Sequence, residues 1–418
     1  MTPTLSIGKM TALLMFLAIN FQSCVKDTVS KTYTMYKPVY KTTAEVRANI
    51  KNDAALPVSN PGKMFVLSNY IFLNEIDKGI HVIDNSNPAN PVNKYFIAIP
   101  GNIDLAVTGT TLYADLYTDL VTLDISNPSL VQVKKITENV FPNRLYSGGF
   151  VANNTKIITD WTKKDTTVTE DVNMTTNGNF LVDASVFAVA RPGSSANKAA
   201  VGISGSMARF TLLDNYLYTV TENALNVFNI SHPQNPVFSN KINLPFGIET
   251  IYPFKSNLFI GSQTGMLIYG TANPAQPVQA GSFTHARVCD PVIADDNYAY
   301  VTLSSGSRCA GFINQLDVVN IQNLQSPKLV KSYPLTNPHG LSKDGNTLFI
   351  CDGAAGLKVF DAADQNNIKL LQTLDGIDAY DVIAFNGIAI VSAKDGLYEY
   401  NYTDRSKVQQ ISRISFNK

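Results

Sequence analysis

Residue types on which metal and covalent catalysis depend are scarce in this chain. Its 418 residues include only four Cys, four His and one Trp. It contains no G-x-S-x-G, P-loop, G-x-G-x-x-G, C-x-x-C or H-E-x-x-H sequence. These absences exclude the common signatures of serine hydrolases, nucleotide-binding proteins and zinc proteases, and they predict neither a cofactor nor a metal ion.

An excess of charge of either sign is also missing. Lys and Arg together number 33, as do Asp and Glu, so the formal net charge is zero. Because no basic run stands out, we expect no nucleic-acid partner. Long stretches of Ala, Glu, Lys and Leu are absent, whereas Tyr (19) and Phe (21) are plentiful. That balance favours strands over helices.

Apolar runs of transmembrane length are absent, and the longest is Met10–Phe21. With Lys9 before it, this run has the length and charge of a signal peptide. It ends in "FQSC" at Cys24, which resembles the lipobox of bacterial lipoproteins. The resemblance implies cleavage before Cys24 and acylation of that residue, which would anchor the chain to a membrane. An ordinary secretory signal is the alternative.

This interpretation predicts both the parts of the chain and its place in the cell. Residues 1–23 are the expected signal peptide, and residues 24–62 are the expected tether, with a short helix within Thr42–Lys51. We expect an exported monomer on the outer membrane, either on its periplasmic side or on the cell surface.

A turn-rich segment recurs after an apolar strand along the rest of the chain. The copies begin at Asp84, Asp124, Asn229, Gly270, Asn320, Asp361 and Asn401. Their starts are separated by 40, 105, 41, 50, 41 and 40 residues. The longest gap leaves room for one degenerate copy, for which Ser185–Ile203 is the candidate. The sequence therefore predicts eight repeats of about forty residues, with seven as the alternative.

Each repeat contains four short runs of strand-forming residues separated by Gly, Asn, Asp, Pro and Ser. Four strands in about forty residues are typical of a β-propeller blade. We therefore expect an all-β propeller of four-stranded blades over residues 63–418. A series of β-sandwich domains is the alternative, but the regular spacing without linkers argues against it.

The third strands read "IHVID" (Ile80–Asp84), "LVTLD" (Leu120–Asp124), "LDVVN" (Leu316–Asn320) and "LKVFD" (Leu357–Asp361). They resemble LVIVD repeats, which occur mostly in exported bacterial propellers of unsettled role. The resemblance covers Lys63 to about Phe416 and implies the fold, but it implies no activity. Because the last residue of the motif varies, we interpret it as a turn residue rather than a ligand.

Polar residues recur near the start of the first strand of each copy. In a propeller these strands line the channel, and we call the rim where they begin the upper face. The candidate binding residues at the channel mouth are Lys63, Asp104, Arg209, Glu249, Asp290, His339 and Asp381, with an eighth position near Gly149. We expect these residues either to bind a ligand or to pair with one another and with water in the channel.

Two insertions, Thr162–Asn179 and Ser304–Gln315, are predicted to be loops between second and third strands, which places both on the upper face. Cys289 and Cys309 fall on the same rim, so we expect a disulfide between them in an exported protein. A metal site that adds His285 is the weaker alternative. Cys351 lies within a strand and is expected to be a buried thiol.

These features favour a lipid-anchored binding or scaffolding propeller of the cell envelope over an enzyme. Its working surface is expected to be the upper face, and its ligand a protein or a glycan. The alternative is a glycan-active hydrolase or lyase that uses a pair of channel carboxylates, such as Glu249 and Asp290.

Overall fold

The computed structural model describes residues 28–144, 146, 156–171, 203–285, 291–305 and 313–417. These residues form two compact units. The smaller unit takes residues from Met1–Tyr40, Leu145–Phe150 and Asp160–Val186, and the larger unit takes Lys41–Arg144, Val151–Thr159 and Phe187–Lys418. The predicted signal peptide and Cys24 lie outside the described residues.

The smaller unit is a two-stranded ribbon of β1 (Thr28–Lys41) and β11 (Ile157–Asp171), with the last residue of β1 and the first three of β11 assigned to the larger unit. Side chains tie the two strands together: the Thr34 hydroxyl donates to Asp165 at 2.7 Å, and Lys163 lies over the ring of Tyr36. Much of the predicted upper loop at Thr162–Asn179 is therefore strand, so that expectation was wrong over Thr162–Asp171. The remaining residues of that loop lie outside the described residues.

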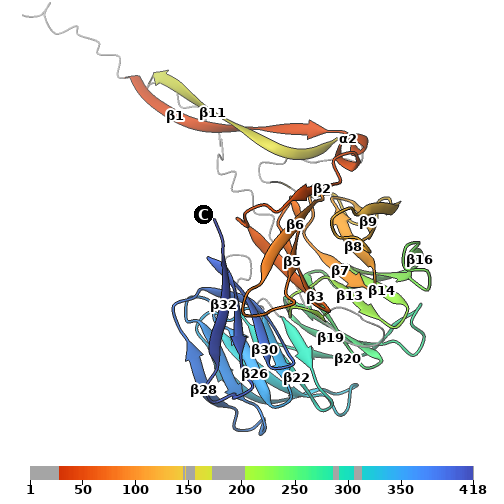
Figure 1. Ribbon diagram of the computed structural model, residues 1–418, viewed down its shortest axis with the longest axis vertical. Helices are drawn as coiled ribbons and strands as arrows, with labels where there is room; N and C mark the ends of the chain where they lie inside the picture. The colour runs from red at the N-terminus through yellow and green to blue at the C-terminus, as the bar shows by residue number, and fades with distance from the viewer. Residues whose placement is uncertain are drawn as a thin grey trace, which may run out of the picture. The chain divides into compact units, whose positions relative to one another are not determined.

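The larger unit contains seven blades of four antiparallel strands, and their colours run in chain order from orange to blue in Figure 1. Blade 1 comprises β3 (Pro61–Leu67), β4 (Tyr70–Glu75), β5 (Gly79–Asp84) and β6 (Val92–Ala98). Blade 2 comprises β7 (Leu105–Thr108), β8 (Thr111–Leu116), β9 (Asp119–Asp124) and β10 (Gln132–Thr137). Blade 3 comprises β13 (Phe210–Leu213), β14 (Tyr216–Thr221), β15 (Ala224–Asn229) and β16 (Val237–Asn243).

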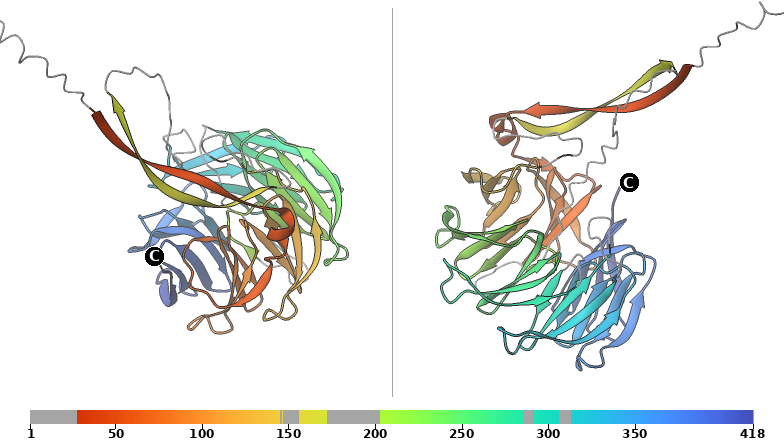
Figure 2. Two further views of the ribbon diagram at one scale, coloured as in Figure 1. Left: turned by 90° about the horizontal axis from the view of Figure 1, so that it is seen from above. Right: turned by 180° about the vertical axis from the view of Figure 1, so that it is seen from behind.

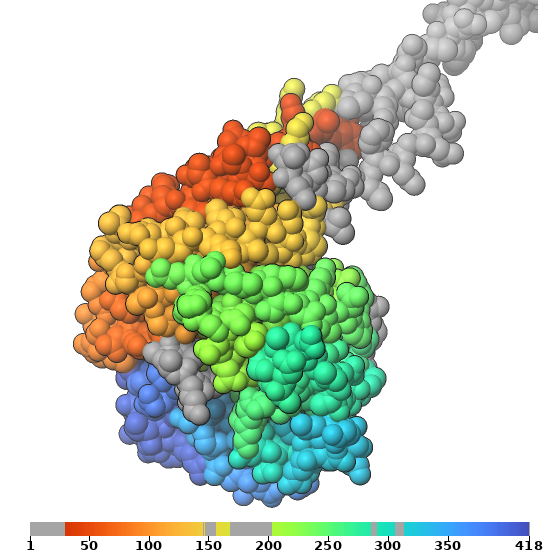
Figure 3. Space-filling view, turned by 90° about the vertical axis from the view of Figure 1, so that its right-hand side faces the viewer, coloured from red at the N-terminus to blue at the C-terminus, as the bar shows by residue number. Residues whose placement is uncertain are grey.

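Blades 4 to 7 repeat the same strand order, and the space-filling view in Figure 3 shows the colours following one another in the same way. These blades comprise β17 (Ile248–Phe254), β18 (Asn257–Ser262), β19 (Gly265–Gly270) and β20 (Val278–Thr284); β21 (Val292–Ala294), β22 (Tyr298–Leu303), β23 (Gln315–Asn320) and β24 (Lys328–Pro334); β25 (Leu341–Asp344), β26 (Thr347–Cys351), β27 (Leu357–Asp361) and β28 (Lys369–Leu374); and β29 (Ala379–Phe385), β30 (Ile388–Ala393), β31 (Gly396–Asn401) and β32 (Gln409–Ser415).

The blade number is therefore seven, the alternative to the eight that the spacing suggested. Between β10 and β13 the described residues form only β11 and the short β12 (Ile203–Ser204). Neither belongs to a separate four-stranded sheet. Of the candidate degenerate copy, Ser185–Ile203, only Ile203 lies within the described residues.

Blade 1 carries two additional strands. On its outer edge β2 (Lys51–Ala54) pairs with β6, and on its inner edge β12 pairs with β3. The helix expected within Thr42–Lys51 is α2 (Thr43–Arg47), whose N-terminus is closed by reciprocal hydrogen bonds between Thr42 and Glu45. The predicted tether thus contains regular structure, and the propeller sheet already begins at Lys51.

The first and last blades lie side by side and close the ring (Figure 2). Met64 and Ile71 of blade 1 pack with Ile383 and Ile390 of blade 7 in one buried cluster. In addition, the Asn417 N–H donates to the Val58 carbonyl at 2.8 Å. Apolar packing between complete blades therefore joins the two ends, and blade 7 takes all its strands from the C-terminal end.

Every blade has a bulge between its third and fourth strands, close to the turn that joins them. The motif-ending Asp or Asn closes that turn: Asp84, Asp124 and Asn229 each accept a backbone N–H two residues ahead. The bulge strengthens the local twist of the outermost strand, which discourages pairing between exposed edges of different molecules.

Candidate functional site

Six of the seven predicted channel-mouth residues lie near the start of the first strand of their blades, with Lys63, Asp104, Arg209 and Asp381 at equivalent places and Glu249 and His339 one residue earlier. Lys63, Glu249 and Asp381 are on the first strands β3, β17 and β29, while Asp104, Arg209 and His339 stand one or two residues before β7, β13 and β25. Asp290 lies outside the described residues, as does the position near Gly149. The six described residues split into a buried group and a partly exposed group.

The buried group is centred on an ion pair between Lys63 Nζ and Asp104 Oδ2, which are 2.8 Å apart. Lys63 is 1% exposed and Asp104 is 2% exposed. Burial lowers the pKa of Lys63, as does the neighbouring Arg209, while Asp104 opposes both effects. Asp104 Oδ2 also accepts the backbone N–H of Arg209 at 2.5 Å. Both partners are therefore occupied within the protein.

The channel of the propeller is filled by its own chain, the segment Ile203–Arg209. Ser204 pairs with Phe65 of blade 1, and the Ser206 hydroxyl accepts the N–H of Leu341 in blade 6. The Ala208 carbonyl accepts the N–H of Ile251 in blade 4 at 3.0 Å. With the Arg209–Asp104 bond to blade 2, this channel segment contacts four blades directly.

Asp381 of blade 7 packs closely against the channel segment. Side-chain atoms added at Gly205 or Gly340 would overlap with its carboxylate. Asp381 is 2% exposed, and its Oδ1 accepts the N–H of Val382 at 3.0 Å. The two glycines are thus required by the close approach of this carboxylate. Asp381 is enclosed by the protein and has little access to a ligand.

Arg209, Glu249 and His339 are partly exposed. Glu249 accepts a hydrogen bond from Gln263 at 3.2 Å, and His339 lies 3.2 Å from the side chain of Asn337. The His339 ring also packs edge-on against Tyr380. Among the six described members of the predicted ring, these three side chains are the ones that a ligand in solvent can reach.

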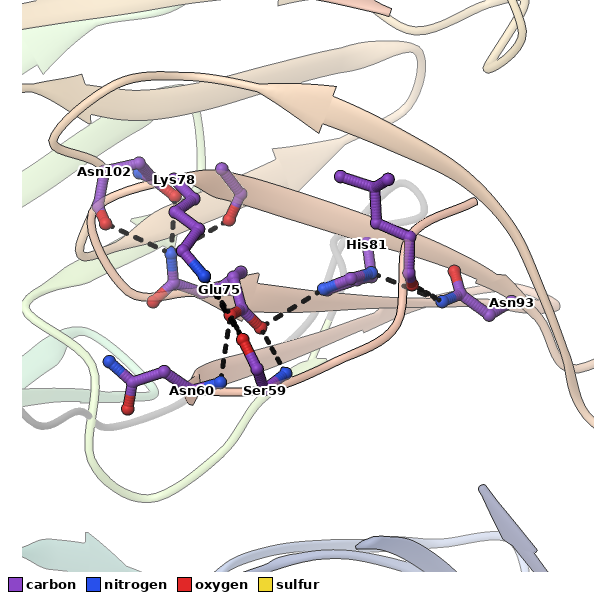
Figure 4. A network of polar contacts seen from close by, with 10 residues as sticks. Ser59, Asn60, Glu75, Lys78, His81, Asn93 and Asn102 are labelled. Carbon is purple, nitrogen blue, oxygen red and sulfur yellow. Dashed lines mark hydrogen bonds and ion pairs between the residues drawn. The ribbon is translucent and has the colours of Figure 1, made fainter. Parts of the chain in front are cut away.

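A second polar network, around Glu75, was not predicted from the sequence (Figure 4). Glu75 accepts hydrogen bonds from the Ser59 hydroxyl at 2.5 Å, the Asn60 N–H at 2.9 Å and Lys78 at 3.1 Å. His81 lies 3.4 Å away. Burial acts to raise the pKa of Glu75, but the bonds from His81 and Ser59 hold it well below the ordinary value.

This network fastens the chain that enters blade 1 to the end of β4. A carboxylate surrounded by so many donors is a poor proton acceptor, so its role is structural. The only signal in the sequence was polar: a Ser-Asn pair before the first strand and an Asn-Glu pair at the end of the second.

Asp115 connects the loop before β7 to β8. It accepts the N–H groups of Ile103 and Asp104 and the side chain of Asn102, each at 2.8 Å. Burial raises the pKa of Asp115 to about 6, although Arg144 nearby acts to lower it. These bonds fix the backbone of Asp104, which holds the Lys63 ion pair in place.

The predicted disulfide cannot be placed, because Cys289 and Cys309 lie outside the described residues, and it stays a prediction. Cys351 is a free thiol with no exposed surface, and burial raises its pKa well above the ordinary value. Within the described ranges, no group of three or more His, Cys, Asp or Glu side chains could hold a metal ion. Nor does any helix in those ranges have the length and hydropathy of a membrane span.

Comparison of the sequence with family models gives a match to the LVIVD repeat at residues 58–96, 103–137, 204–243 and 287–334. The chain contains LVIVD repeats. The four matches fall on blades 1, 2, 3 and 5, and the remaining blades of the LVIVD propeller share their strand order. No curated protein matches the sequence.

Solved structures resemble the LVIVD propeller in fold. The periplasmic gluconolactonase of Pseudomonas aeruginosa matches with a TM-score of 0.51 and 11% identity, covering 85% of this chain and 96% of that one. A Lactobacillus plantarum protein gives 0.51 and 10%, covering 84% and 96%. The computationally designed Ika8 protein gives 0.51 and 9%, covering 87% and 90%. At these identities the likeness concerns the fold alone.

Proposed function

We propose that this LVIVD propeller is a non-enzymatic binding or scaffolding protein of the cell envelope, held on the membrane by lipid at Cys24. The observation that carries the proposal is the filled channel. The buried segment Ile203–Arg209 runs across the channel and bonds to blades 1, 4 and 6, and Lys63 and Asp104 neutralise each other beside it. A partner would then bind at one of the two rims of the propeller.

The filled channel gives no support to the alternative of a glycan hydrolase or lyase. Such an enzyme needs two carboxylates that face an open cleft. Asp104 is bound to Lys63 and to the Arg209 backbone, and Asp381 packs against Gly205 and Gly340. Of the pair Glu249 and Asp290, Glu249 is partly exposed and bonded to Gln263, and Asp290 lies outside the described residues. The partly exposed Arg209, Glu249 and His339 support the upper face as the binding surface.

The anchor is tested by metabolic labelling with radioactive palmitate in a Gram-negative expression host. We expect the full chain to carry the label and to sediment with membranes, and Cys24→Ala to lose both properties. An unlabelled, soluble wild-type chain would overturn the anchor. Protease treatment of whole cells then distinguishes surface display from the periplasmic side.

The upper face is tested by a glycan and peptide binding screen of the full chain carrying Cys24→Ser, which has no lipid. We expect Glu249→Ala with His339→Ala to weaken binding of the selected ligand about tenfold or more, which corresponds to roughly 1.4 kcal/mol. Unchanged affinity in this double variant would exclude the upper face as the site for that ligand.

A further inference from the structure

The lower face of the propeller, where the turns lie that join first to second and third to fourth strands, contains a groove of about 650 Å³. Blades 4, 5 and 6 line it. They contribute the end of β17, the turn from β21 into β22, the turn from β25 to β26 and the turn from β27 to β28. A groove of this size falls within the usual range for small-molecule sites. Nothing described so far uses it.

Three aromatic side chains line the groove: Tyr252 and Phe254 from blade 4 and Tyr298 from blade 5. All three are partly exposed. The Tyr252 hydroxyl donates to the Ala294 carbonyl at 3.2 Å, which fixes that ring against blade 5. Lys255 Nζ lies over the Phe254 ring, 5.6 Å from its centre, so Tyr252 and Tyr298 supply the main aromatic surfaces of a mostly polar lining.

Each charged side chain that lines the groove has an ion-pair partner, although one of these partners, Lys255, lies outside the lining. Lys343 Nζ lies 2.9 Å from Asp295 Oδ2, and Asp296 pairs with Lys255 at 2.8 Å. Burial acts to raise the pKa of Asp295, but the bonds from Lys343 and from the backbone lower it below the ordinary value. The lining itself has two anions and one cation, and Lys255 beside it balances the remaining charge, so an anionic or a cationic ligand would compete with an ion-pair partner already in place.

The groove is also rigid. Asp295 Oδ1 accepts the N–H groups of Asn297 and Tyr298 at 3.0 and 2.9 Å, and its Oδ2 accepts the Tyr300 hydroxyl at 3.0 Å. Gln365 of blade 6 donates to that hydroxyl at 3.2 Å and so joins the two blades. A site formed in advance binds its ligand without the cost of ordering its own groups.

Some hydrogen-bonding groups remain available to a ligand. Among the contacts of the described residues, none involves the side-chain amide of Asn346 or the hydroxyl of Tyr298. Both residues line the groove, and Asn346 is exposed. The groove therefore combines aromatic surfaces, neutral polar groups and balanced charges.

We propose that this groove is a binding site for a neutral saccharide. A pyranose ring has a face of C–H groups that stacks on an aromatic ring and a rim of hydroxyls that bonds to amides, hydroxyls and paired charges. The site lies on the opposite rim from the predicted channel-mouth ring and does not depend on it.

The test is isothermal titration of the full chain carrying Cys24→Ser with maltotetraose, cellotetraose, mannotetraose and chitotetraose. We expect at least one of these uncharged sugars to bind, with an affinity that does not change between low and high sodium chloride. Tyr298→Ala should weaken that binding about tenfold, because one stacking surface is lost.

The matched control is Tyr216→Ala, because Tyr216 is the first residue of β14 as Tyr298 is of β22, yet it lies outside the groove. It should bind normally. Should Tyr298→Ala fold poorly by circular dichroism, Asn346→Ala replaces it, since an exposed side chain without contacts can be removed without disturbing the blade. That variant should weaken binding several-fold.

Three outcomes would overturn the site. None of the four sugars binds; heparin fragments bind in their place with strong salt dependence; or Tyr298→Ala and Asn346→Ala bind as wild type while Glu249→Ala with His339→Ala loses binding. The last result would reject the groove but leave the proposed upper-face function standing, so the two failures can be distinguished.

Discussion

Glu399 is a single buried acid at the junction of the first and last blades. It lies on β31 with no exposed surface, and Asn85 from blade 1 donates to its Oε2 at 3.1 Å. Within the described residues no hydrogen bond reaches its other oxygen. Burial is the main cause that raises the pKa of Glu399 to about 7. Its charge therefore disfavours the folded state.

The sign of the resulting pH dependence follows from the two pKa values. The unfolded chain loses this proton near the ordinary value of 4.5, and the folded chain loses it near 7. The destabilisation by the Glu399 charge is absent below pH 4.5 and complete above about pH 7. Relative to Glu399→Gln, we expect wild type to lose up to about 3 kcal/mol of unfolding free energy across that interval.

Urea denaturation of both proteins at several pH values measures this difference. Glu222→Gln, at an exposed position, is the control and should follow the wild-type curve. A constant difference between wild type and Glu399→Gln at all pH values would contradict a shifted Glu399.

At the scale of elements, hydrogen bonds from one blade to the turn of the next hold neighbouring blades in register. Tyr113 on β8 donates to the Pro233 carbonyl at 2.7 Å, and Tyr218 on β14 donates to the Pro274 carbonyl at 2.8 Å. Both carbonyls belong to the turns between third and fourth strands of the following blade. The turns between third and fourth strands thus also supply hydrogen-bond acceptors to the preceding blade.

Tyr113→Phe and Tyr218→Phe should each destabilise the protein by roughly 1 kcal/mol, since each leaves a carbonyl without its donor. Tyr70→Phe is the control, because its hydroxyl makes no hydrogen bond among the described contacts. Thermal unfolding of the three variants gives the comparison. Equal losses in all three variants would show that these two hydrogen bonds do not account for the loss of stability.

The repeats were predictable from the sequence because each blade is a local unit. Alternating apolar residues, turn residues and the motif-ending Asp or Asn depend on neighbours within about forty residues. Alignment of first strands even placed Lys63, Asp104 and Asp381 at equivalent positions. Their partners were not predictable, because Gly205 and Gly340 meet Asp381 only after the ring has closed.

The long interval between Asp124 and Asn229 misled the blade count for a related reason. The interval is long enough for one more repeat, but its longest described strand, β11, pairs with β1, which is more than a hundred residues away in the chain. The groove was equally hidden, since it is formed by turns of three blades whose sequences carry no common motif. Pairing over such distances depends on topology rather than on local pattern.

For the whole molecule, the channel segment Ile203–Arg209 links blades that are not neighbours in the ring, such as blades 1, 4 and 6. It contacts blades 1, 2, 4 and 6 by hydrogen bonds and lies against Asp381 of blade 7. Met207 and Ala208 are 5% and 2% exposed. The segment therefore acts as a common core for the ring, in addition to the packing between adjacent blades.

This arrangement predicts that Gly205→Ala destabilises the entire propeller. The added methyl group would overlap with the Asp381 carboxylate, and overpacking of a tight interior typically costs about 1–3 kcal/mol. Gly270→Ala, where the nearest atoms stand 3.8 Å from the new carbon, is the matched control and should behave as wild type. Urea denaturation followed by circular dichroism gives the measurement, because Trp161, the only Trp, belongs to the smaller unit and its fluorescence would not report on the propeller.

Combining Gly205→Ala with Asp381→Ala separates the steric cause from any other, because the second change removes the atoms that clash. The two losses should then be clearly less than additive, with a coupling of roughly 1 kcal/mol or more. If they add simply, the methyl group is accommodated elsewhere and the channel segment does not lie against Asp381. If hydrogen exchange shows that Gly205→Ala lowers protection in only some of the blades, the segment does not couple the blades.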